Sequence, residues 1–245
     1  MRNDGGGEYY LNRLYVAPEF QGKGVGRTAV ALCEDFYPDA KRWSLDCPAD
    51  REANKKCYEY CGYRDAGLRE KVSDKLTLAR YEKMIGGIYA MWAAYLESAA
   101  EVIRKSFATV AAEFGLTEQN CPNHTSFIRA ERLRAQYKSG YAMYGLYEDA
   151  RLVGYVSLSG NRGASFEIHN LAVLPEYRHR GHGTALVDFC KAAARESGAE
   201  KIVIGIIREN ARLRSWYVAR GFASVGSVRD EHLPFAIEFM EYHYL

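Results

Sequence analysis

The sequence lacks the features that mark several large classes of protein. The net charge of its 245 residues is only +2, so no strongly basic field favours nucleic acid as a partner. The longest apolar stretch, near residues 84–96, is interrupted by Gly86 and Gly87 and is too short to cross a bilayer. The chain also shows no signal peptide. These absences predict a cytoplasmic protein with neither a nucleic-acid nor a membrane partner.

The cysteines lack the spacing of a metal site. There are six, and none forms the CxxC pair that is typical of zinc ligands. Cys57 and Cys61 fall on successive turns of one expected helix, and Cys190 falls on another. Each is expected to pack as a reduced thiol. The sequence therefore predicts no metal and requires no nucleophilic cysteine.

The most informative feature is a repeated segment. LYVAPEFQGKGVGRTAV at 14–30 returns as LAVLPEYRHRGHGTALV at 171–187, with two glycines in register. Each copy predicts a short strand, a glycine turn and a helix. Glycines just before a helix let backbone N–H groups approach an anion, and the helix N-terminus adds partial positive charge. The repeat therefore predicts two pyrophosphate-binding turns.

The spacing of the turn separates it from two other phosphate-binding motifs. A P-loop would place Lys and then Ser or Thr after its last glycine, and a dinucleotide turn would read GxGxxG followed by an acidic residue. Neither copy fits these patterns. Both read Gln/Arg-x-x-Gly-x-Gly, at Gln21–Gly26 and Arg178–Gly183. This pattern resembles the acyl-CoA signature of the GNAT N-acyltransferase superfamily.

The resemblance continues downstream of both turns. Residues 42–67 and 201–226 align without a gap, which pairs Tyr58 with Tyr217. Each segment predicts a strand, a helix that stops at a glycine, and another strand. In the GNAT family this block is the fifth strand and the fourth helix, and its tyrosine faces the sulfur of CoA.

The two copies are unequal in extent. The second has the family's elements in order, and they are expected at 88–94 (strand), 98–114 and 127–137 (helices), 141–147 and 152–159 (a hairpin) and 165–173 (strand). The first copy has only a hairpin turn at 3–7 before its glycine turn, so three strands and two helices are missing. An ancestral tandem gene, a fragment, or a partner that supplies the rest would each account for this.

The resemblance therefore implies a tandem α/β arrangement. Each module would have the GNAT fold, a mixed and mostly antiparallel sheet with flanking helices. We expect residues 1–85 to form a partial, degenerate module that corresponds to the C-terminal half of the fold. Residues 86–245 would form a complete acyltransferase module. Whether the protein is a monomer or a homodimer stays open.

The resemblance also assigns an acetyl-CoA site in the second copy. Backbone groups at Leu171, Ala172 and Val173 would pair with the pantetheine arm as an added strand does. Asn210 would hold the same arm, with a helix N-cap as the alternative role. The pyrophosphate would bind the turn residues Arg178, His179, Arg180, Gly181, His182, Gly183 and Thr184. A second, weaker CoA site would use Gln21, Gly22, Lys23, Gly24, Val25, Gly26 and Tyr58.

Acyl transfer to an amine needs a base, because a lysine-like amine with a pKa of about 10.4 must lose its proton before it attacks. Glu167 lies eleven residues before Arg178, where a number of GNAT enzymes carry a catalytic glutamate. Strand alternation would place Glu167, His169, Leu171 and Val173 on one face, which makes His169 a second candidate base or a substrate contact. Tyr217 takes the position of the family's general acid, which protonates the departing thiolate.

The first copy departs from this pattern. Tyr10 stands where the second copy has Glu167, and Arg51 stands where it has Asn210. We therefore expect the first copy to hold CoA weakly, or only to pack against the second, and to contribute little to turnover.

The resemblance also indicates where the amine acceptor would bind. The resemblance places it between residues 116–126 and 230–234. The carboxylates Glu118, Asp230 and Glu231 would attract a cationic amine there, although solvated loop acids give the same sequence signal. The resemblance implies an N-acetyltransferase that moves an acetyl group from acetyl-CoA to a small-molecule or peptide amine by direct attack in a ternary complex. Transfer of a longer acyl group and a non-catalytic acyl-CoA-binding or sensor module remain the alternatives.

Overall fold

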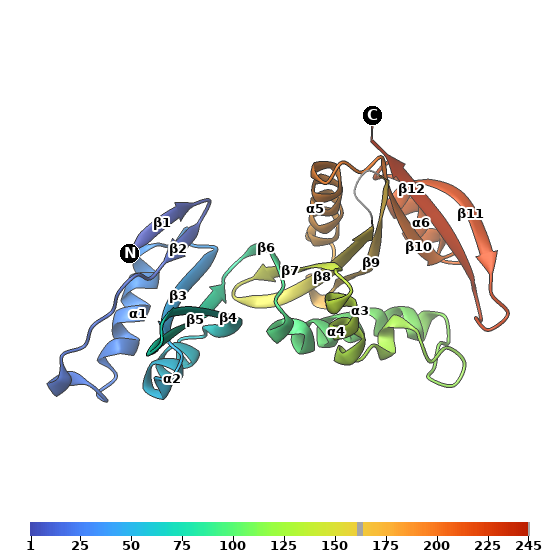
Figure 1. Ribbon diagram of the computed structural model, residues 1–245. Coiled ribbons are helices and arrows are strands. Elements are labelled where there is room, and N and C mark those ends of the chain that lie inside the picture. The colour runs from blue at the N-terminus through green and yellow to red at the C-terminus, as the bar shows by residue number, and fades with distance from the viewer. Residues whose placement is uncertain (161–163, 245) are drawn as a thin grey trace. The chain divides into compact units, whose positions relative to one another are not determined.

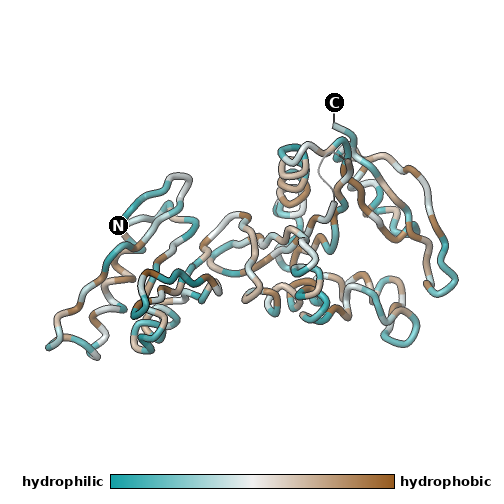
Figure 2. Tube along the Cα trace, viewed as in Figure 1, coloured by the Kyte–Doolittle hydropathy of each residue, from teal (hydrophilic) through white to brown (hydrophobic). Residues whose placement is uncertain are grey.

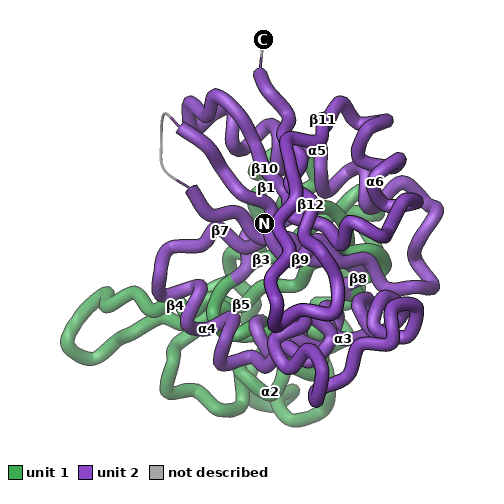
Figure 3. Tube along the Cα trace, turned by 90° about the vertical axis from the view of Figure 1, so that its right-hand side faces the viewer, with its two compact units in different colours: residues 1–87, 92–95, 147–151 green, residues 88–91, 96–146, 152–245 purple. Residues whose placement is uncertain are grey.

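The computed structural model describes residues 1–160 and 164–244, and these form two compact units (Figure 1). The first unit holds residues 1–87 together with two short later stretches, 92–95 and 147–151. The second unit holds 88–91, 96–146 and the chain from Leu152 onward (Figure 3). None of the helices among the described residues is long and apolar enough to cross a membrane.

The first unit is a five-stranded sheet in the order β1-β2-β3-β5-β4 with two helices. β2 and β3 are parallel, and the other pairs are antiparallel. An aromatic core that includes Tyr9, Trp43, Tyr63 and Tyr81 fills the space between the sheet and its helices. The elements are β1 (Arg2–Gly5), β2 (Glu8–Tyr10), α1 (Val25–Phe36), β3 (Arg42–Pro48), α2 (Glu52–Tyr60), β4 (Arg64–Ser73) and β5 (Leu76–Met84).

The strand expected just before the first glycine turn does not form. β2 ends at Tyr10, which pairs with Arg2 at the start of β1, and residues 11–17 have no regular structure. The last backbone hydrogen bond that extends β2 toward the turn is donated by the N–H of Leu11 to the carbonyl of Ser44. A strand needs a partner along its length. In the second unit that partner is the ten-residue β8, which pairs as far as Val173.

The second unit is built on a seven-stranded sheet in the order β11-β12-β10-β9-β8-β7-β6. β9 and β10 are parallel, whereas β12 is antiparallel to both of its neighbours. The elements are β6 (Gly87–Ala90), α3 (Leu96–Glu113), α4 (Ala130–Lys138), β7 (Ala142–Glu148), β8 (Arg151–Gly160), β9 (Ser165–Val173), α5 (His182–Glu196), β10 (Lys201–Ile207), α6 (Ala211–Val218), β11 (Ala223–Arg229) and β12 (Ala236–His243).

Helices cover both faces of this sheet. α5 and α6 share one core with the sheet, and α5 contributes its apolar stripe of Leu186, Val187, Cys190 and Ala194. α3 packs with α4 and against β9 on the other face (Figure 1). Hydrophilic residues gather in loops such as the tip between β11 and β12 (Figure 2).

Two expected elements have different limits from those predicted. β6 stops at Ala90, and residues 93–95 form a 3-10 turn instead of continuing the strand expected to Ala94. α4 begins at Ala130 rather than at Phe127, because Thr125–Phe127 is a 3-10 turn. His124 caps this turn by accepting a hydrogen bond from the backbone of Ser126.

Candidate functional site

Two parallel strands part at the centre of the second sheet. β9 pairs with β10 from Ser165↔Lys201 to Ile168↔Ile204, and there the register ends. β9 nevertheless continues to Val173 and β10 to Ile207. Their C-terminal ends therefore offer strand edges to which an extended ligand can add by backbone hydrogen bonds.

A β-bulge in β9 lies where the strands part. Asn170 has a positive φ of 51°, and Tyr155 and Ser157 of β8 pair with Ala172 and His169, so β9 has one extra residue. Leu171 and Val173 pack into the same core as Ile168. The expectation that Glu167, His169, Leu171 and Val173 share one face is therefore wrong. The bulge turns Leu171 and Val173 toward α5 and leaves Glu167 and His169 on the opposite face.

The glycine turn leads from β9 into α5. Gly181 is the N-cap, with φ of 87°, and His179 has φ of 61°, which is unusual for a residue with a side chain. The first backbone bond of the helix runs from Ala185 to Gly181. The N–H groups of residues 182–184 therefore precede the helical ladder and point toward the helix start. With alternating backbone conformations, such groups form a concave anion-binding nest.

The first copy adopts the same turn. Gly22 and Gly24 have φ of 71° and 83°, at the positions of His179 and Gly181. Gly24 is likewise the N-cap of its helix, α1. The backbone shape expected from the repeated glycines is therefore present twice.

The side chain of Arg178 is engaged within the second unit. Its Nε donates to the carbonyl of Val173 at 3.2 Å, and Nη1 and Nη2 reach Thr109 Oγ1 at 3.0 Å and the Ser106 carbonyl at 2.6 Å in α3. Burial, and then the nearby cation Arg212, lowers the pKa of Arg178. Arg178 thus positions the turn, and Arg212 is a second cation near it that the sequence reasoning missed.

The second glycine of the turn faces α6. A Cβ atom at Gly183 would lie 3.2 Å from Cζ2 of Trp216, so the glycine lets α5 approach that indole. Arg220 stacks its guanidinium 3.6 Å from the Trp216 ring centre and donates to Thr184 Oγ1 at 2.5 Å. Trp216 and Arg220 therefore fix the start of α5. Trp216 and Arg220 are four residues apart, which is about one helical turn. This spacing is the feature of the sequence from which their contact could have been predicted.

Glu167 and His169 lie next to the point where the strands part. Oε1 of Glu167 is 3.6 Å from Nδ1 of His169, and Nε2 of His169 is 2.7 Å from the hydroxyl of Ser159. The Glu167 side chain is 48% exposed and that of His169 is 21% exposed. Burial lowers the pKa of His169, against the opposing effect of Glu167. His169 is therefore held as a neutral imidazole between a carboxylate and a hydroxyl, which suits a proton acceptor.

Tyr217 lies on α6 and is only 2% exposed. Its ring packs edge-on against Trp216 and Phe222. Burial raises the pKa of Tyr217 well above its ordinary value, so the phenol keeps its proton, as an acid must. Burial raises the pKa of Cys190 to about 12, so this thiol is no ready nucleophile.

Asn210 is the N-cap of α6, because its Oδ1 accepts from the backbone N–H of Leu213 at 2.9 Å. The capping role named as its alternative is therefore real. The cap uses the amide oxygen, so a contact to pantetheine would have to come from the amide nitrogen. Arg51, at the equivalent place in the first copy, makes no side-chain cap.

The two segments expected to hold the acceptor meet in one apolar cluster. Leu116 and Cys121 pack with Phe235, and Ile207 and Leu233 pack against them. Glu118 lines an open pocket of about 520 Å³, which also contains His124, Arg129 and Arg132. Asp230 accepts from the backbone of His232 at 2.9 Å and so shapes its loop, whereas Glu231 is exposed.

Residues 1–63 and 110–222 match the sequence profile of the acetyltransferase (GNAT) family, which is more than half of the chain. The chain belongs to this family. The GNAT resemblance and the α/β fold expected from it are thereby confirmed, and the two matched segments fit a tandem arrangement.

The curated relatives that this chain matches are described as N-acetyltransferases. Proteins described as uncharacterized N-acetyltransferases of Mycobacterium bovis and Mycobacterium tuberculosis are 32% identical to this GNAT chain over 79 residues. The match covers 32% of this chain and 51% of each relative. The chain thus spans about half the length of the curated relatives it matches.

Solved GNAT structures share the fold. The PaiA N-acetyltransferase of Thermoplasma acidophilum, in complex with coenzyme A, aligns with a TM-score of 0.51 and 22% identity over 66% of this chain and 100% of that protein. The ribosomal-protein-S18-alanine N-acetyltransferase of Escherichia coli aligns with a TM-score of 0.53 and 14% identity over 65% of this chain and 94% of that protein. At these identities the likeness is one of fold.

Proposed function

We propose that the second module, residues 86–245, is an N-acetyltransferase that moves the acetyl group of acetyl-CoA to a primary amine by direct attack in a ternary complex. The observation that carries the proposal is the parting of β9 and β10 after Ile168 and Ile204. The segment of β9 that continues past its pairing with β10 runs from Ile168 to Val173. The glycine turn follows the C-terminal end of this segment, and Glu167 and His169 lie at its N-terminal end.

The residues around this opening fit acetyl-CoA. Backbone N–H groups at the start of α5 suit a pyrophosphate, with Arg212 near Arg178 as added positive charge. Backbone groups of Leu171 and Val173 suit the pantetheine amides, and Val173 keeps its N–H for this although its carbonyl accepts from Arg178. The cosubstrate supplies the activated thioester. The CoA-bound structure of the PaiA relative agrees with this choice.

The protein's part in the chemistry is the movement of two protons. Glu167, directly or through His169, takes the proton that the amine must lose to attack. As the new carbon–nitrogen bond forms and the carbon–sulfur bond breaks, Tyr217 supplies a proton to the departing thiolate, and the phenol recovers a proton from the acylated nitrogen. Its raised pKa keeps the phenol protonated before the reaction. Because Tyr217 is 2% exposed, the thioester would have to reach it through the opening.

The first module, residues 1–85, is proposed to be degenerate. It keeps the turn, but β2 stops before the segment that corresponds to Leu171–Val173. Tyr10 donates to Asp46 at 2.8 Å, so the residue in the place of Glu167 is engaged within the sheet. Burial raises the pKa of Tyr58 to about 12. A weak CoA site at Gln21–Gly26 remains part of the proposal. The free cysteines suit a reducing cytoplasm.

The test is release of free thiol from acetyl-CoA over a panel of amines, with the acylated product identified by mass spectrometry. The panel includes polyamines, aminoglycosides, amino acids and peptides with free N-termini. Turnover with any primary amine supports the proposal. Tight acetyl-CoA binding without turnover across the panel would instead identify a binding or sensor module. Faster turnover with longer acyl-CoA esters than with acetyl-CoA would show that the enzyme transfers a longer acyl group.

A further inference from the structure

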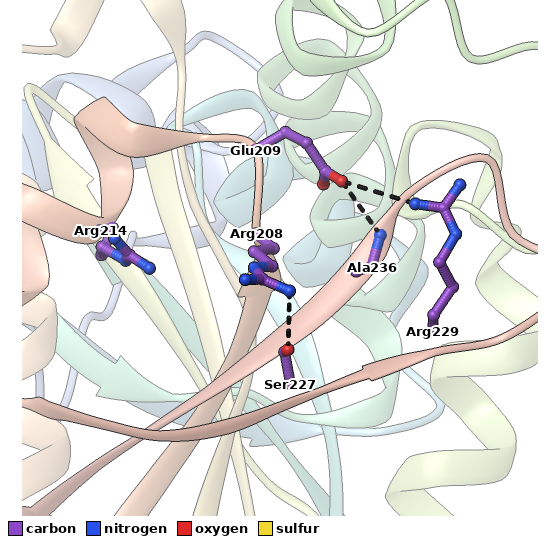
Figure 4. Close-up of a pocket in the computed structure, with 6 residues that line it drawn as sticks. All are labelled: Arg208, Glu209, Arg214, Ser227, Arg229 and Ala236. Atoms are coloured by element: carbon purple, nitrogen blue, oxygen red, sulfur yellow. Dashed lines mark hydrogen bonds and ion pairs between the residues drawn. The ribbon is translucent and has the colours of Figure 1, made fainter.

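An arginine-lined pocket lies on the second unit, beside α6. Its volume is about 560 Å³, and its walls come from the end of β10, from α6, and from β11 and β12 (Figure 4). Three arginines line it: Arg208 directly after β10, Arg214 in α6 and Arg229 at the end of β11. Hydrogen bonds join these distant parts of the chain, because Arg214 of α6 donates to Glu238 of β12 and Arg208 donates to Ser227 of β11.

The pocket and the glycine turn lie on different sides of α6. Trp216 faces Gly183 of the turn, whereas Arg214 faces Glu238 of β12. Residues two apart on a helix point about 200° apart around its axis. A ligand that follows the opening between β9 and β10 to the turn therefore leaves this pocket unfilled.

Hydrogen bonds hold two of the three arginines, Arg208 and Arg214. Nε of Arg214 donates to both carboxylate oxygens of Glu238, at 2.9 Å each, and Glu238 is only 1% exposed. Arg208 Nη1 donates to the hydroxyl of Ser227 at 3.2 Å. Each of these arginines uses one nitrogen of its guanidinium group for these bonds. The other N–H donors of the same group remain for a ligand in the pocket.

The charges of the pocket do not balance. Glu209 is its one carboxylate among the lining residues, and Oε1 of Glu209 lies 4.0 Å from Arg229 Nη1 and accepts weakly from the backbone of Ala236 at 3.5 Å. Even with buried Glu238 counted, three positive charges face two negative ones. Like charges repel, so a bound anion would stabilise the arrangement.

We propose that this pocket binds the oxyanion group, a carboxylate or a phosphate, of a small molecule other than the acyl-CoA. Guanidinium forks donate two parallel hydrogen bonds to either group. The volume lies in the range of about 300–1,000 Å³ that small-molecule pockets occupy. The site would make the protein responsive to an anionic metabolite or to an acceptor that carries a negative group.

The test is calorimetric titration of inorganic phosphate and of citrate, separately, against a chloride buffer of equal ionic strength. The proteins are the wild type, the double variant Arg208→Gln/Arg229→Gln, and the control Arg195→Gln, which removes an exposed charge on α5. We expect saturable binding of at least one anion to the wild type and the control, and roughly tenfold weaker binding to the double variant. Arg208→Lys, which keeps the charge but loses the fork, should weaken binding less.

Three results would overturn the proposal. The first is no saturable binding to the wild type, and the second is equal binding to the double variant. The third is a double variant that loses affinity for CoA but not for dephospho-CoA, because the cosubstrate's own phosphate would then occupy the pocket. Ser227→Ala, which releases Arg208, replaces the double variant if circular dichroism shows that the latter is unfolded. No arm measures acetyl transfer, so the outcome is independent of the proposed activity.

Discussion

Arg178 donates through Nε to the carbonyl oxygen of Val173 at 3.2 Å, and so ties the glycine turn to the last residue of β9. Gln21 makes the equivalent bond to Val16 in the first copy, at 2.9 Å. The side chain that opens the Gln/Arg-x-x-Gly-x-Gly pattern therefore does the same work in both copies. It holds the turn against the segment that leads into it.

The shared bond gives a prediction for acetyl-CoA affinity. Arg178→Gln should keep the bond to Val173, as Gln21 does, and should leave affinity within about threefold, whereas Arg178→Ala should weaken it roughly tenfold through loss of a charge-assisted bond. Isothermal calorimetry measures both. Equal and large losses in the two variants would show that the positive charge of Arg178 contacts a phosphate directly.

The second prediction concerns the glycine that faces α6. Gly183→Val should weaken acetyl-CoA binding and lower stability by about 1–3 kcal/mol, because its Cβ would already lie 3.2 Å from Trp216. The matched variant is Gly26→Val in the first copy, where the nearest atom is Cys57 Sγ at 3.5 Å. That variant should leave turnover nearly intact. If a folded Gly26→Val protein loses as much activity as Gly183→Val, the first copy is part of the active machinery.

The third prediction separates acid from base. Glu167→Gln and Tyr217→Phe should each lower kcat by about 10²–10⁴-fold while acetyl-CoA affinity stays nearly unchanged. Loss of the base should move the pH optimum toward the pKa of the free amine, because the enzyme would then depend on amine that is already neutral. Loss of the acid should lower kcat at every pH and leave the alkaline limb unchanged, since burial keeps the Tyr217 proton in place to high pH.

The pair of Glu167 and His169 needs its own discriminating measurement, because Nδ1 of the imidazole lies 3.6 Å from the carboxylate. Full activity and an unchanged pH profile in Glu167→Gln, together with no turnover in His169→Ala, would transfer the role of base to His169. Ser159→Ala should then also shift the pH profile, because the hydroxyl is 2.7 Å from Nε2.

The fourth prediction is a loss of stability in mild acid. Burial lowers the pKa of His124, so the unfolded chain binds its proton more readily than the folded protein does. The folded state is therefore favoured above the unfolded pKa of about 6.5 and loses this advantage as pH falls through the lowered pKa. His124→Asn keeps a capping oxygen for Ser126 without a titrating ring, and its free energy of unfolding should fall less between pH 7.5 and 5.5, as measured in urea. An identical pH dependence in both proteins would assign the effect to other groups.

The fifth prediction uses the backbone that the two turns share. His179 has φ of 61° where the first copy has Gly22 at 71°. His179→Gly should stabilise the protein by about 0.5–1 kcal/mol, since relief of about 1–2 kcal/mol of left-handed strain exceeds the added entropy of the unfolded chain. The reverse change, Gly22→His, should destabilise by a similar amount, because no atom lies within 4 Å of a Cβ there and only the backbone opposes it. Urea unfolding midpoints measure both, and a destabilised His179→Gly protein would contradict the argument.

Local sequence carried enough information for the turn and for the elements around it. Glycine at positions 22, 24 and 181 permits positive φ, and the helix follows from the periodic apolar residues after it. The order of strands and helices in the second module was also predictable, because each element is long and is bounded by turn residues.

Features set by distant parts of the chain were not predictable. The bulge at Asn170 depends on the register with β8, and it reversed the face on which Leu171 and Val173 were expected. The apolar run at 14–16 reads as a strand but has no neighbour to pair with. The convergence of Arg208, Arg214 and Arg229 depends on contacts of Arg208 and Arg214 with residues of β11 and β12.

Ile207 lies at the end of β10, on the border of the opening, and it also packs against the apolar cluster that joins the two acceptor segments. A ligand that moves this strand end on binding would shift the apolar cluster that we propose as the platform for the amine. Thermodynamic linkage then requires each substrate to change the affinity for the other by the same factor. We expect Ile207→Val to bring that mutual factor closer to one, while the affinity for each substrate alone changes little.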